Sequence, residues 1–400
     1  MKLIISFCLL LVGCSQQLTP EEYINTGEKY LQAKEWKSAI IEFKNAIKQS
    51  SNNVRARALL GEAYLHTYSS GAAIKELTKA QELGIKDEKI IVLLGRAYEQ
   101  LNQNEKILSD IKANSAQSSS VQADINALRA KALLRSGQIS KAEEALNVAK
   151  TIDPNRTEVR MAWSTYEQIL GNTDSQREWL IPLLERNGGV ADAWSQMAVL
   201  EQKLNEFEKA EVSYTRAISL RKIVHVDYIK RALLRISQKN YKGAFIDIGI
   251  LKKAGVNWPV IGHAEGLIAY QQNNYDLAQT HLEKVLSKDP DYYPSQLLIG
   301  LTHFKKGNYQ NAVQKLQMYL SVFPDAHQAN FIYAASLLKL GRILDSIPIL
   351  EKLDKSQPHD FRVLSLLGNA YIQNNQTEQG IQILHKVVEL EPDIARSRLQ

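Results

Sequence analysis

Cysteine is almost missing from this 400-residue chain. It has two, Cys8 and Cys14, and both lie within the first fourteen residues. A disulfide framework, a zinc knuckle or a nucleophilic thiol therefore has no cysteine to use in the rest of the chain. The eight histidines are scattered, and none belongs to a metal-binding HExxH motif. We expect no metal site and no cofactor.

Sequence signatures of catalysis are missing as well. The chain has no Walker loop, no dinucleotide-binding glycine fingerprint and no G-x-S-x-G nucleophile elbow. A net charge of +6 with a pI near 9.0 is a mild bias over this length, and not the footprint of nucleic-acid binding. We predict a protein that is not an enzyme and does not bind nucleic acid.

What the chain does have is a pattern that repeats with a period of about 34 residues. Prolines fall at Pro290, Pro324, Pro358 and Pro392, and Pro154 lies in the same register. Each follows a segment with helical spacing of apolar residues, such as 275-YDLAQTHLEKVLSKDP-290. This period is typical of tetratricopeptide repeats, so we predict an all-α superhelix, an α-solenoid of antiparallel helix pairs. We expect each proline in the first turn of the following helix.

Small residues divide the array, residues 20–392, into about eleven units. The units start at 20, 54, 88, 123, 157, 191, 225, 259, 293, 327 and 361. A large side chain at either of two positions would force the paired helices apart. Position 8 holds Gly27, Gly61, Gly95, Ala130, Ala198, Ala232, Gly266, Gly300, Ala334 and Gly368. Position 20 holds Ala39, Ala73, Ala142, Ala210, Ala244, Ala278 and Ala312.

Two units depart from the pattern, and the last one is incomplete. Unit 88–122 has Ile107 in place of alanine, and its serine-rich segment 113–122 predicts a loop and a slack joint. Unit 157–190 has Ser164 and Gln176 at its small positions. Residues 393–400 predict the start of a further repeat without its second helix. We therefore expect the chain to be the front part of a longer array.

The first nineteen residues form a separate segment. An apolar run over residues 3–12 is too short to span a bilayer but suits a signal peptide. It ends in Leu11-Val12-Gly13-Cys14, which is similar to a bacterial lipobox. We predict a signal peptide over residues 1–13 and a tether over residues 14–19, lipidated at Cys14. The alternative is an ordinary signal peptide with a chance cysteine.

The groove of such an array is lined by helix A positions 2, 5, 9, 12 and 13. Units two to four place basic residues there, namely Arg55, His66, Lys89, Arg96, Lys131 and Arg135, with the acidic residues Glu62, Asp124 and Glu99 among them. Units seven to ten place apolar residues there, namely Ile229, Leu233, Tyr270, Leu297, Leu301, Phe304 and Phe331. One hypothesis is a basic stretch for an acidic peptide or anionic glycan, followed by an apolar stretch for a peptide helix or strand. The other is solvated charge beside apolar packing between neighbouring helices.

The chain resembles the tetratricopeptide-repeat lipoproteins of the PEP-CTERM/exosortase system, the PrsT family. The resemblance rests on the lipobox followed at once by the first repeat, on 38-SAIIEFKNAIKQSSNNVRARALLGEAYL-65, on 74-IKELTKAQELG-84 and on 275-YDLAQTHLEKVLSKDPDYYPSQLLIG-300. It covers essentially the whole chain, and it transfers one functional residue, Cys14.

The resemblance implies a non-catalytic scaffold that binds protein partners in exopolysaccharide export and PEP-CTERM protein sorting. Ser15 follows the lipidated cysteine where inner-membrane lipoproteins often have aspartate. This implies an outer-membrane lipoprotein with its body in the periplasm of a Gram-negative bacterium. Two other functions stay open: an assembly lipoprotein for pili or outer-membrane proteins, and a regulatory partner of an envelope glycosyltransferase or cell-wall enzyme.

Overall fold

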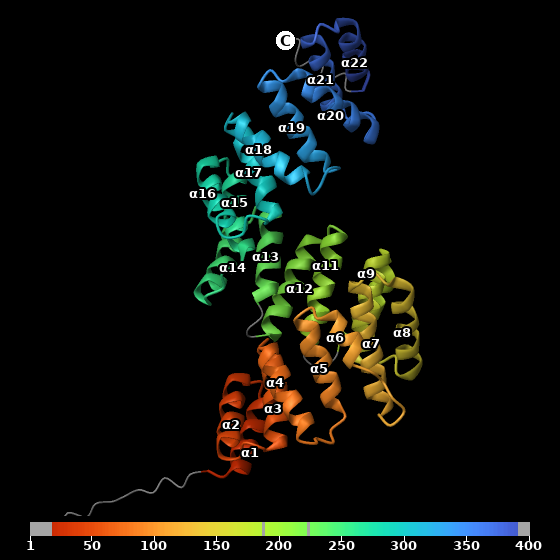
Figure 1. Ribbon diagram of the computed structural model, residues 1–400, viewed down its shortest axis with the longest axis vertical. Coiled ribbons are helices and arrows are strands. Elements are labelled where there is room, and N and C mark those ends of the chain that lie inside the picture. Colours follow the sequence, from red (N-terminus) through yellow and green to blue (C-terminus); the bar gives the residue numbers. More distant parts are fainter. Residues whose placement is uncertain (1–17, 186–188, 222–224, 391–400) are drawn as a thin grey trace, which may run out of the picture. The chain divides into compact units, whose positions relative to one another are not determined.

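The computed structural model describes residues 18–185, 189–221 and 225–390 (Figure 1). Every regular element in these ranges is an α-helix, and consecutive helices form eleven antiparallel pairs. The predicted all-α solenoid is therefore confirmed. The signal-peptide residues 1–13, the lipobox and residues 393–400 lie outside the described ranges.

The first helices of the pairs have 12 to 17 residues. They are α1 (Pro20–Gln32), α3 (Val54–His66), α5 (Lys89–Gln100), α7 (Ser119–Arg135), α9 (Thr157–Leu170), α11 (Ala191–Lys203), α13 (His225–Ser237), α15 (Pro259–Gln271), α17 (Tyr293–Lys305), α19 (His327–Lys339) and α21 (Phe361–Gln373). From α9 onwards the first helices begin at a constant interval, at positions 157, 191, 225, 259, 293, 327 and 361. The period of the sequence is thus the period of the fold.

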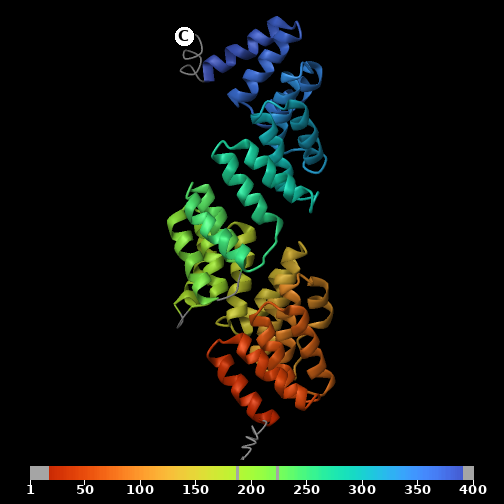
Figure 2. The same cartoon turned by 90° about the vertical axis from the view of Figure 1, so that its left-hand side faces the viewer.

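The second helices return antiparallel to the first. They are α2 (Trp36–Gln49), α4 (Ser70–Glu82), α6 (Asn104–Asp110), α8 (Ile139–Ile152), α10 (Thr173–Leu184), α12 (Phe207–Leu220), α14 (Tyr241–Lys253), α16 (Tyr275–Leu286), α18 (Tyr309–Leu320), α20 (Ile343–Ser356) and α22 (Thr377–Leu390). In both views the two helices of a pair run side by side, as Figure 2 shows from a second direction.

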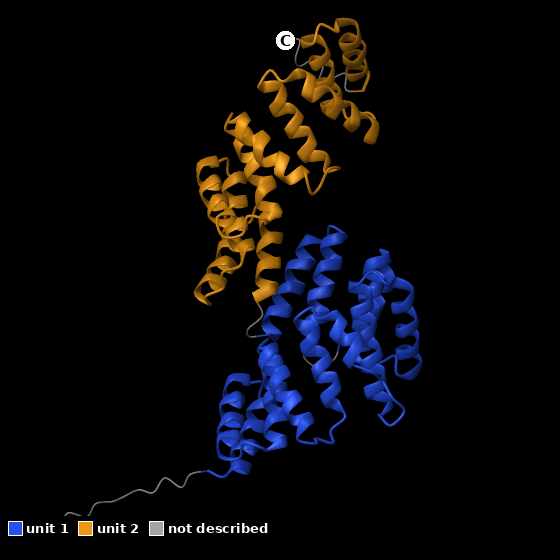
Figure 3. Ribbon diagram, in the orientation of Figure 1, with its two compact units in different colours: residues 1–223 blue, residues 224–400 orange. Residues whose placement is uncertain are grey.

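The chain divides into two compact units, residues 1–223 and 224–400 (Figure 3). Unit 1 contains α1 to α12, and unit 2 contains α13 to α22. Successive first helices touch one another from α1 to α9 in unit 1 and from α13 to α21 in unit 2. Each of these series forms a continuous layer of first helices, so side chains at the same repeat position recur along one face.

In most pairs whose first helix has a glycine at repeat position 8, a large side chain of the second helix fits against it. A Cβ atom added at Gly266 would lie 2.9 Å from Leu282 Cδ2, and one added at Gly300 would lie 2.8 Å from Leu316 Cδ2. Both leucines are completely buried. The expected close approach of the paired helices therefore depends on these glycines, because any side chain there would occupy the space of a core leucine.

The third pair differs from the sequence prediction in where its loop ends. Helix α6 has only seven residues, and no helix covers residues 111–118. Residues 119–122, predicted as loop, form the first turn of α7 instead. Ile107 and Ile111 are buried together with Ile125 and Leu128 of α7. One hydrophobic core therefore continues across the junction where we expected a slack joint.

The periodic prolines within the described ranges lie in the turns between pairs, so the prediction that they occupy the first helical turn is wrong. The Tyr292 amide donates to the Asp289 carbonyl at 3.2 Å across a turn that contains Pro290, and α17 begins only at Tyr293. The Ala326 amide closes the equivalent turn around Pro324. Proline is the second residue of each turn, where its fixed φ is favourable.

The fifth pair accommodates polar residues where most other pairs have glycine or alanine. Ser164 and Gln176 are both fully enclosed. The Ser164 hydroxyl donates to Gln196 Oε1 at 2.8 Å. This bond satisfies a polar group that burial would otherwise leave unpaired.

Candidate functional site

Five charged side chains from three successive first helices of unit 1 meet in one network. We call this network the charged ladder, and it consists of Arg96 and Glu99 on α5, Lys131 and Arg135 on α7, and Glu158 on α9. Lys131 Nζ lies 2.9 Å from Glu99 Oε2 and 2.8 Å from Glu158 Oε2. Arg135 Nη2 completes the pairing of Glu99 at 2.9 Å, and Arg96 Nε completes that of Glu158 at 2.8 Å.

The centre of the charged ladder is buried, which strengthens its electrostatic interactions. Burial alone would raise the pKa of Glu158. The charges and hydrogen bonds of Lys131 and Arg96 outweigh that effect and lower the pKa of Glu158 to about 2. For Lys131, burial would lower the pKa, but Glu158 and Glu99 raise it above the ordinary value. Both central groups are therefore charged at neutral pH, and each stabilises the other.

The ladder includes three of the six basic residues that the sequence placed in a groove. A fourth, Arg55, is held by two acidic residues of α1, with Nη1 at 2.7 Å from Glu21 and Nη2 at 2.8 Å from Glu28. A fifth, His66, stacks on Trp36 with ring centroids 4.0 Å apart. Burial lowers the pKa of His66, so its ring is neutral at pH 7. Most of these cations are thus matched within the chain.

The sixth basic residue, Lys89, is exposed at the start of α5. It lies near Glu62. Burial raises the pKa of Glu62, and the positive charges of Arg96 and Lys89 reduce that rise. Asp124, in the second turn of α7, is paired with Arg156, whose Nε lies 3.0 Å from Asp124 Oδ1. This face of unit 1 therefore alternates in charge, and it does not form a continuous basic strip.

The seven predicted apolar residues lie on four first helices of unit 2, and we call them the apolar face. They are Ile229, Leu233, Tyr270, Leu297, Leu301, Phe304 and Phe331. Ile229 and Leu301 are buried, and the other five are half-buried. Each half-buried residue shows part of its side chain to solvent and uses the rest for packing.

Two aromatic pairs on the apolar face recur in successive repeats. The rings of Tyr270 and Tyr275 are 5.6 Å apart at an interplanar angle of 62°. Phe304 and Tyr309 repeat this distance and angle in the next pair of helices. Each pair ties the end of a first helix to the start of its second helix. The edge-to-face geometry fixes the orientation of Tyr270 and Phe304.

The sequence analysis missed one residue of the apolar face, Leu267. Leu267 lies one repeat after Leu233 and one repeat before Leu301, and it is half-buried like the first of them. The same repeat alignment contains this signal, because all three occupy position 9. At position 5, where the neighbouring repeats have Ile229 and Leu297, the same repeat has His263. Burial lowers the pKa of His263 to about 4, so its ring is neutral. Its Nδ1 lies 3.1 Å from Ser295 Oγ.

Behind the apolar face, a buried ion pair joins α13 to α14. Asp247 is fully buried, with Oδ2 at 3.0 Å from Arg231 Nε and at 2.9 Å from Arg235 Nη1. Arg235 also donates to the Gly243 carbonyl at 3.0 Å. Both arginines are bound to α14 within the helix pair. The neighbouring face of α13 is therefore formed by Ile229 and Leu233.

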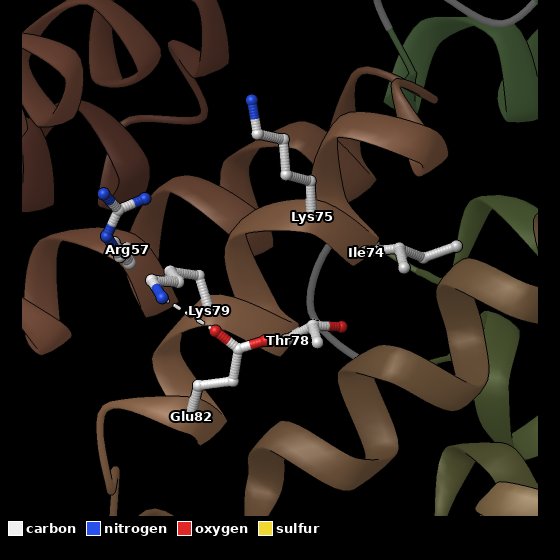
Figure 4. A pocket seen from close by; sticks show the side chains of 6 residues that line it. All are labelled: Arg57, Ile74, Lys75, Thr78, Lys79 and Glu82. Carbon is white, nitrogen blue, oxygen red and sulfur yellow. Dashed lines mark hydrogen bonds and ion pairs between the residues drawn. The ribbon is translucent and has the colours of Figure 1, made fainter.

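A shallow pocket of about 500 Å³ lies against α3 and α4. Its lining side chains are Arg57, Ile74, Lys75, Thr78, Lys79 and Glu82 (Figure 4). Lys79 pairs with Glu82 at 2.8 Å, and Arg57 pairs with Glu76. The pocket contains no histidine, cysteine or pair of carboxylates that general acid–base or nucleophilic catalysis would use.

Within the described ranges, no group of three or more histidine, cysteine, aspartate or glutamate side chains is placed to hold a metal ion. None of the helices in these ranges combines the length and hydrophobicity that a bilayer crossing requires.

Comparison with protein families gives three matches to repeat models. Tetratricopeptide-repeat models match residues 191–223 and 337–400, and the model of anaphase-promoting complex, cyclosome, subunit 3 matches residues 271–353. No curated protein sequence matches the chain.

Several solved structures are similar to this chain. The crystal structure of the APC/C hetero-tetramer Cut9-Hcn1 aligns over 94% of both chains at 13% identity, with a TM-score of 0.51. Yeast Tom70 aligns over 93% of this chain and 92% of its own at 13% identity, with a TM-score of 0.47. A MamA structure covers 42% of this chain and 92% of its own at 20% identity, with a TM-score of 0.38. At 13% identity the likeness to the Cut9-Hcn1 structure concerns the fold alone.

Proposed function

We propose that this chain, a tetratricopeptide-repeat protein, is a non-catalytic scaffold that binds a protein partner through the apolar face of unit 2. The observation that carries the proposal is the column formed by half-buried Leu233 and Leu267 and continued by buried Leu301, with one leucine per repeat on successive first helices. Adjacent packed helices lie roughly 8–10 Å apart. A ligand helix rises about 10.5 Å in seven residues, so apolar residues at heptad spacing match this column.

The charged ladder favours a structural role, and not ligand binding, for the first-helix face of unit 1. An acidic peptide or anionic glycan would have to compete with Glu99 and Glu158 for Lys131, whose two hydrogen bonds are already formed in a buried site. Breaking them would remove one of the two cations that each of these partly buried carboxylates has, which is costly. The ladder therefore aligns α5, α7 and α9, and Lys89 is the predicted basic residue that stays available to a ligand.

The proposed place of action rests on the N-terminal sequence. We propose that Cys14 carries the lipid anchor and that the repeats lie in the periplasm at the outer membrane. The resemblance to PrsT lipoproteins makes exopolysaccharide export and PEP-CTERM protein sorting the proposed process. Assembly of pili or outer-membrane proteins, and control of an envelope glycosyltransferase or cell-wall enzyme, are the two competing processes.

Affinity capture from the native host tests this proposal. The wild-type chain would be compared with a Leu233→Gln/Leu267→Gln variant of the apolar face and with a matched Leu344→Gln control, since Leu344 is an exposed second-helix leucine in the same unit. Circular dichroism would check that all three chains are folded. We expect export or exosortase proteins with the wild type and the control, and their loss with the double variant.

Other outcomes separate the alternatives. Recovery of pilus or cell-wall proteins, again lost with the double variant, would keep the scaffold and replace the process. Equal recovery with the folded double variant would overturn the assignment of binding to the apolar face. A Cys14→Ser chain that still incorporates labelled fatty acid would overturn the lipid anchor.

A further inference from the structure

Helix α14 presents a second apolar surface, on the side of unit 2 that its own core leaves open. Ala244, Ile248 and Leu251 of α14 are buried in the hydrophobic core with residues of α13 and α15. The opposite side of the helix carries six residues that we call the α14 stripe: Lys242, Phe245, Ile246, Gly249, Ile250 and Lys253. Their spacing of three, four, seven, eight and eleven residues from Lys242 puts them on one helical face.

The centre of the α14 stripe is unusually apolar for an exposed surface. Phe245 is 48% exposed, Ile246 is 57% exposed and Ile250 is 39% exposed. A Cβ atom added at Gly249 would meet nothing within 4 Å, so the surface around it is open. Contiguous exposed apolar residues mark contact sites more often than single ones do.

The charges on the exposed side of α14 are all positive. Lys242 and Lys253 lie at the two ends of the stripe, about 16 Å apart along the helix at 1.5 Å per residue. Neither has an ion pair among the described residues. Lys252 is paired with Glu265 at 2.7 Å. The single acidic residue of α14, Asp247, is buried.

We propose that the α14 stripe docks on an anionic lipid surface. Exposed apolar side chains enter the boundary between head groups and acyl chains, while lysines at the edge bind the anionic head groups. Phe245, Ile246 and Ile250 supply the first interaction, and Lys242 and Lys253 supply the second. Such contact would orient unit 2 on a membrane independently of the lipid at Cys14 and of the partner bound to the apolar face.

The equivalent position on another repeat shows why exposed hydrophobicity alone is insufficient. Val212 on α12 occupies the position of Ile246 in the preceding repeat and is 66% exposed. Its exposed neighbours include Glu208, Lys209 and Arg216, so charges of both signs surround it. A surface of mixed charge gains little net attraction to anionic lipids, which makes Val212 the matched control.

Site-specific fluorescence tests the proposal in the full chain. Cys8→Ser and Cys14→Ser remove both native cysteines, and Ile246→Cys or Val212→Cys then introduces one site for an environment-sensitive dye. The N-terminal segment is common to both labelled chains, so any membrane attachment that it provides brings both dyes to the vesicle equally. Vesicles of phosphatidylglycerol and of phosphatidylcholine, each with a spin-labelled quencher lipid, would be added.

We expect enhanced emission and lipid quenching for the dye at residue 246 with phosphatidylglycerol, and neither at residue 212. Lys242→Gln/Lys253→Gln should raise the lipid concentration for half-maximal signal by up to about 30-fold, since each lysine contributes about a factor of five.

Three results would overturn the proposal. The first is no lipid response at residue 246, and the second is an equal response at residue 212 in the control chain. The third is a change at residue 246 that depends on protein concentration without vesicles, which would assign the stripe to contact between two copies. An equal response to phosphatidylcholine would overturn the role of the lysines.

Discussion

Replacement of Lys131 by methionine is the sharpest test of how unit 1 is held together. Lys131 is the one cation shared by both carboxylates of the charged ladder, with hydrogen bonds of 2.9 Å to Glu99 and 2.8 Å to Glu158. Methionine has a similar length and no charge, so the substitution removes both ion pairs while leaving little empty space.

The expected cost follows from these contacts. A hydrogen bond to a charged group contributes about 1.5–3 kcal/mol, so two such bonds set a gross limit of about 3–6 kcal/mol. Neither carboxylate is left without a cation, because Glu99 keeps Arg135 and Glu158 keeps Arg96. We therefore expect a loss near the lower limit, about 3 kcal/mol, which lies within the range for a broken buried ion pair.

Hydrogen exchange read by mass spectrometry would measure this cost locally, since an array of repeats does not unfold in a single step. Protection of α5, α7 and α9 should fall by about a hundredfold. The control is Lys209→Met, which breaks an exposed pair with Glu206 on α12 and should cost no more than about 1 kcal/mol. Unchanged protection of α7 in Lys131→Met would refute the ladder as a stabilising element, and equal loss in unit 2 would refute its local action.

Three further predictions concern packing, pH and helix capping. Gly300→Val should destabilise its repeat by about 1–3 kcal/mol through overlap with Leu316, whereas Gly249→Ala, where space is open, should be neutral or stabilising, as chemical denaturation would show. The pKa of Glu158 falls from 4.5 to about 2 on folding, so its ionised form should stabilise unit 1 above pH 4.5. Roughly 3 kcal/mol of that stability should be lost as the pH falls from 4.5 to 2. An acid titration monitored by circular dichroism that shows no such loss would contradict the lowered pKa of Glu158. Asp360→Ala removes the cap that accepts from the Arg362 amide at 2.9 Å and should cost about 1 kcal/mol, read as faster hydrogen exchange confined to α21.

The helical period was predictable from the sequence because it depends on residue size. Gly266 and Gly300 are conspicuous in a helical pattern, and their partners Leu282 and Leu316 recur at the same interval. The turn geometry of Pro290 was not predictable in the same way. Proline is compatible with both a turn and a first helical position, and the hydrogen bond from Tyr292 to Asp289 decides between them.

The charge pattern shows what a survey of single positions leaves out. Arg96, Lys131 and Arg135 all occupy predicted groove positions, which made them look available to an acidic ligand. Their partners Glu99 and Glu158 occupy other groove positions of neighbouring repeats, so a survey across adjacent repeats contains the signal for the pairing. The rotamers that close those distances depend on the packed helices, and no local pattern encodes them.

Photocrosslinking in the native host tests the central claim of a partner-binding apolar face most directly. Benzoylphenylalanine would replace Tyr270 or Phe304 on the apolar face, and Tyr319 on the second helix α18 as the control. The account predicts that residues 270 and 304 crosslink to the same envelope protein and that residue 319 does not. Crosslinks from residue 319 alone, or from none of the three positions in a folded chain, would contradict it.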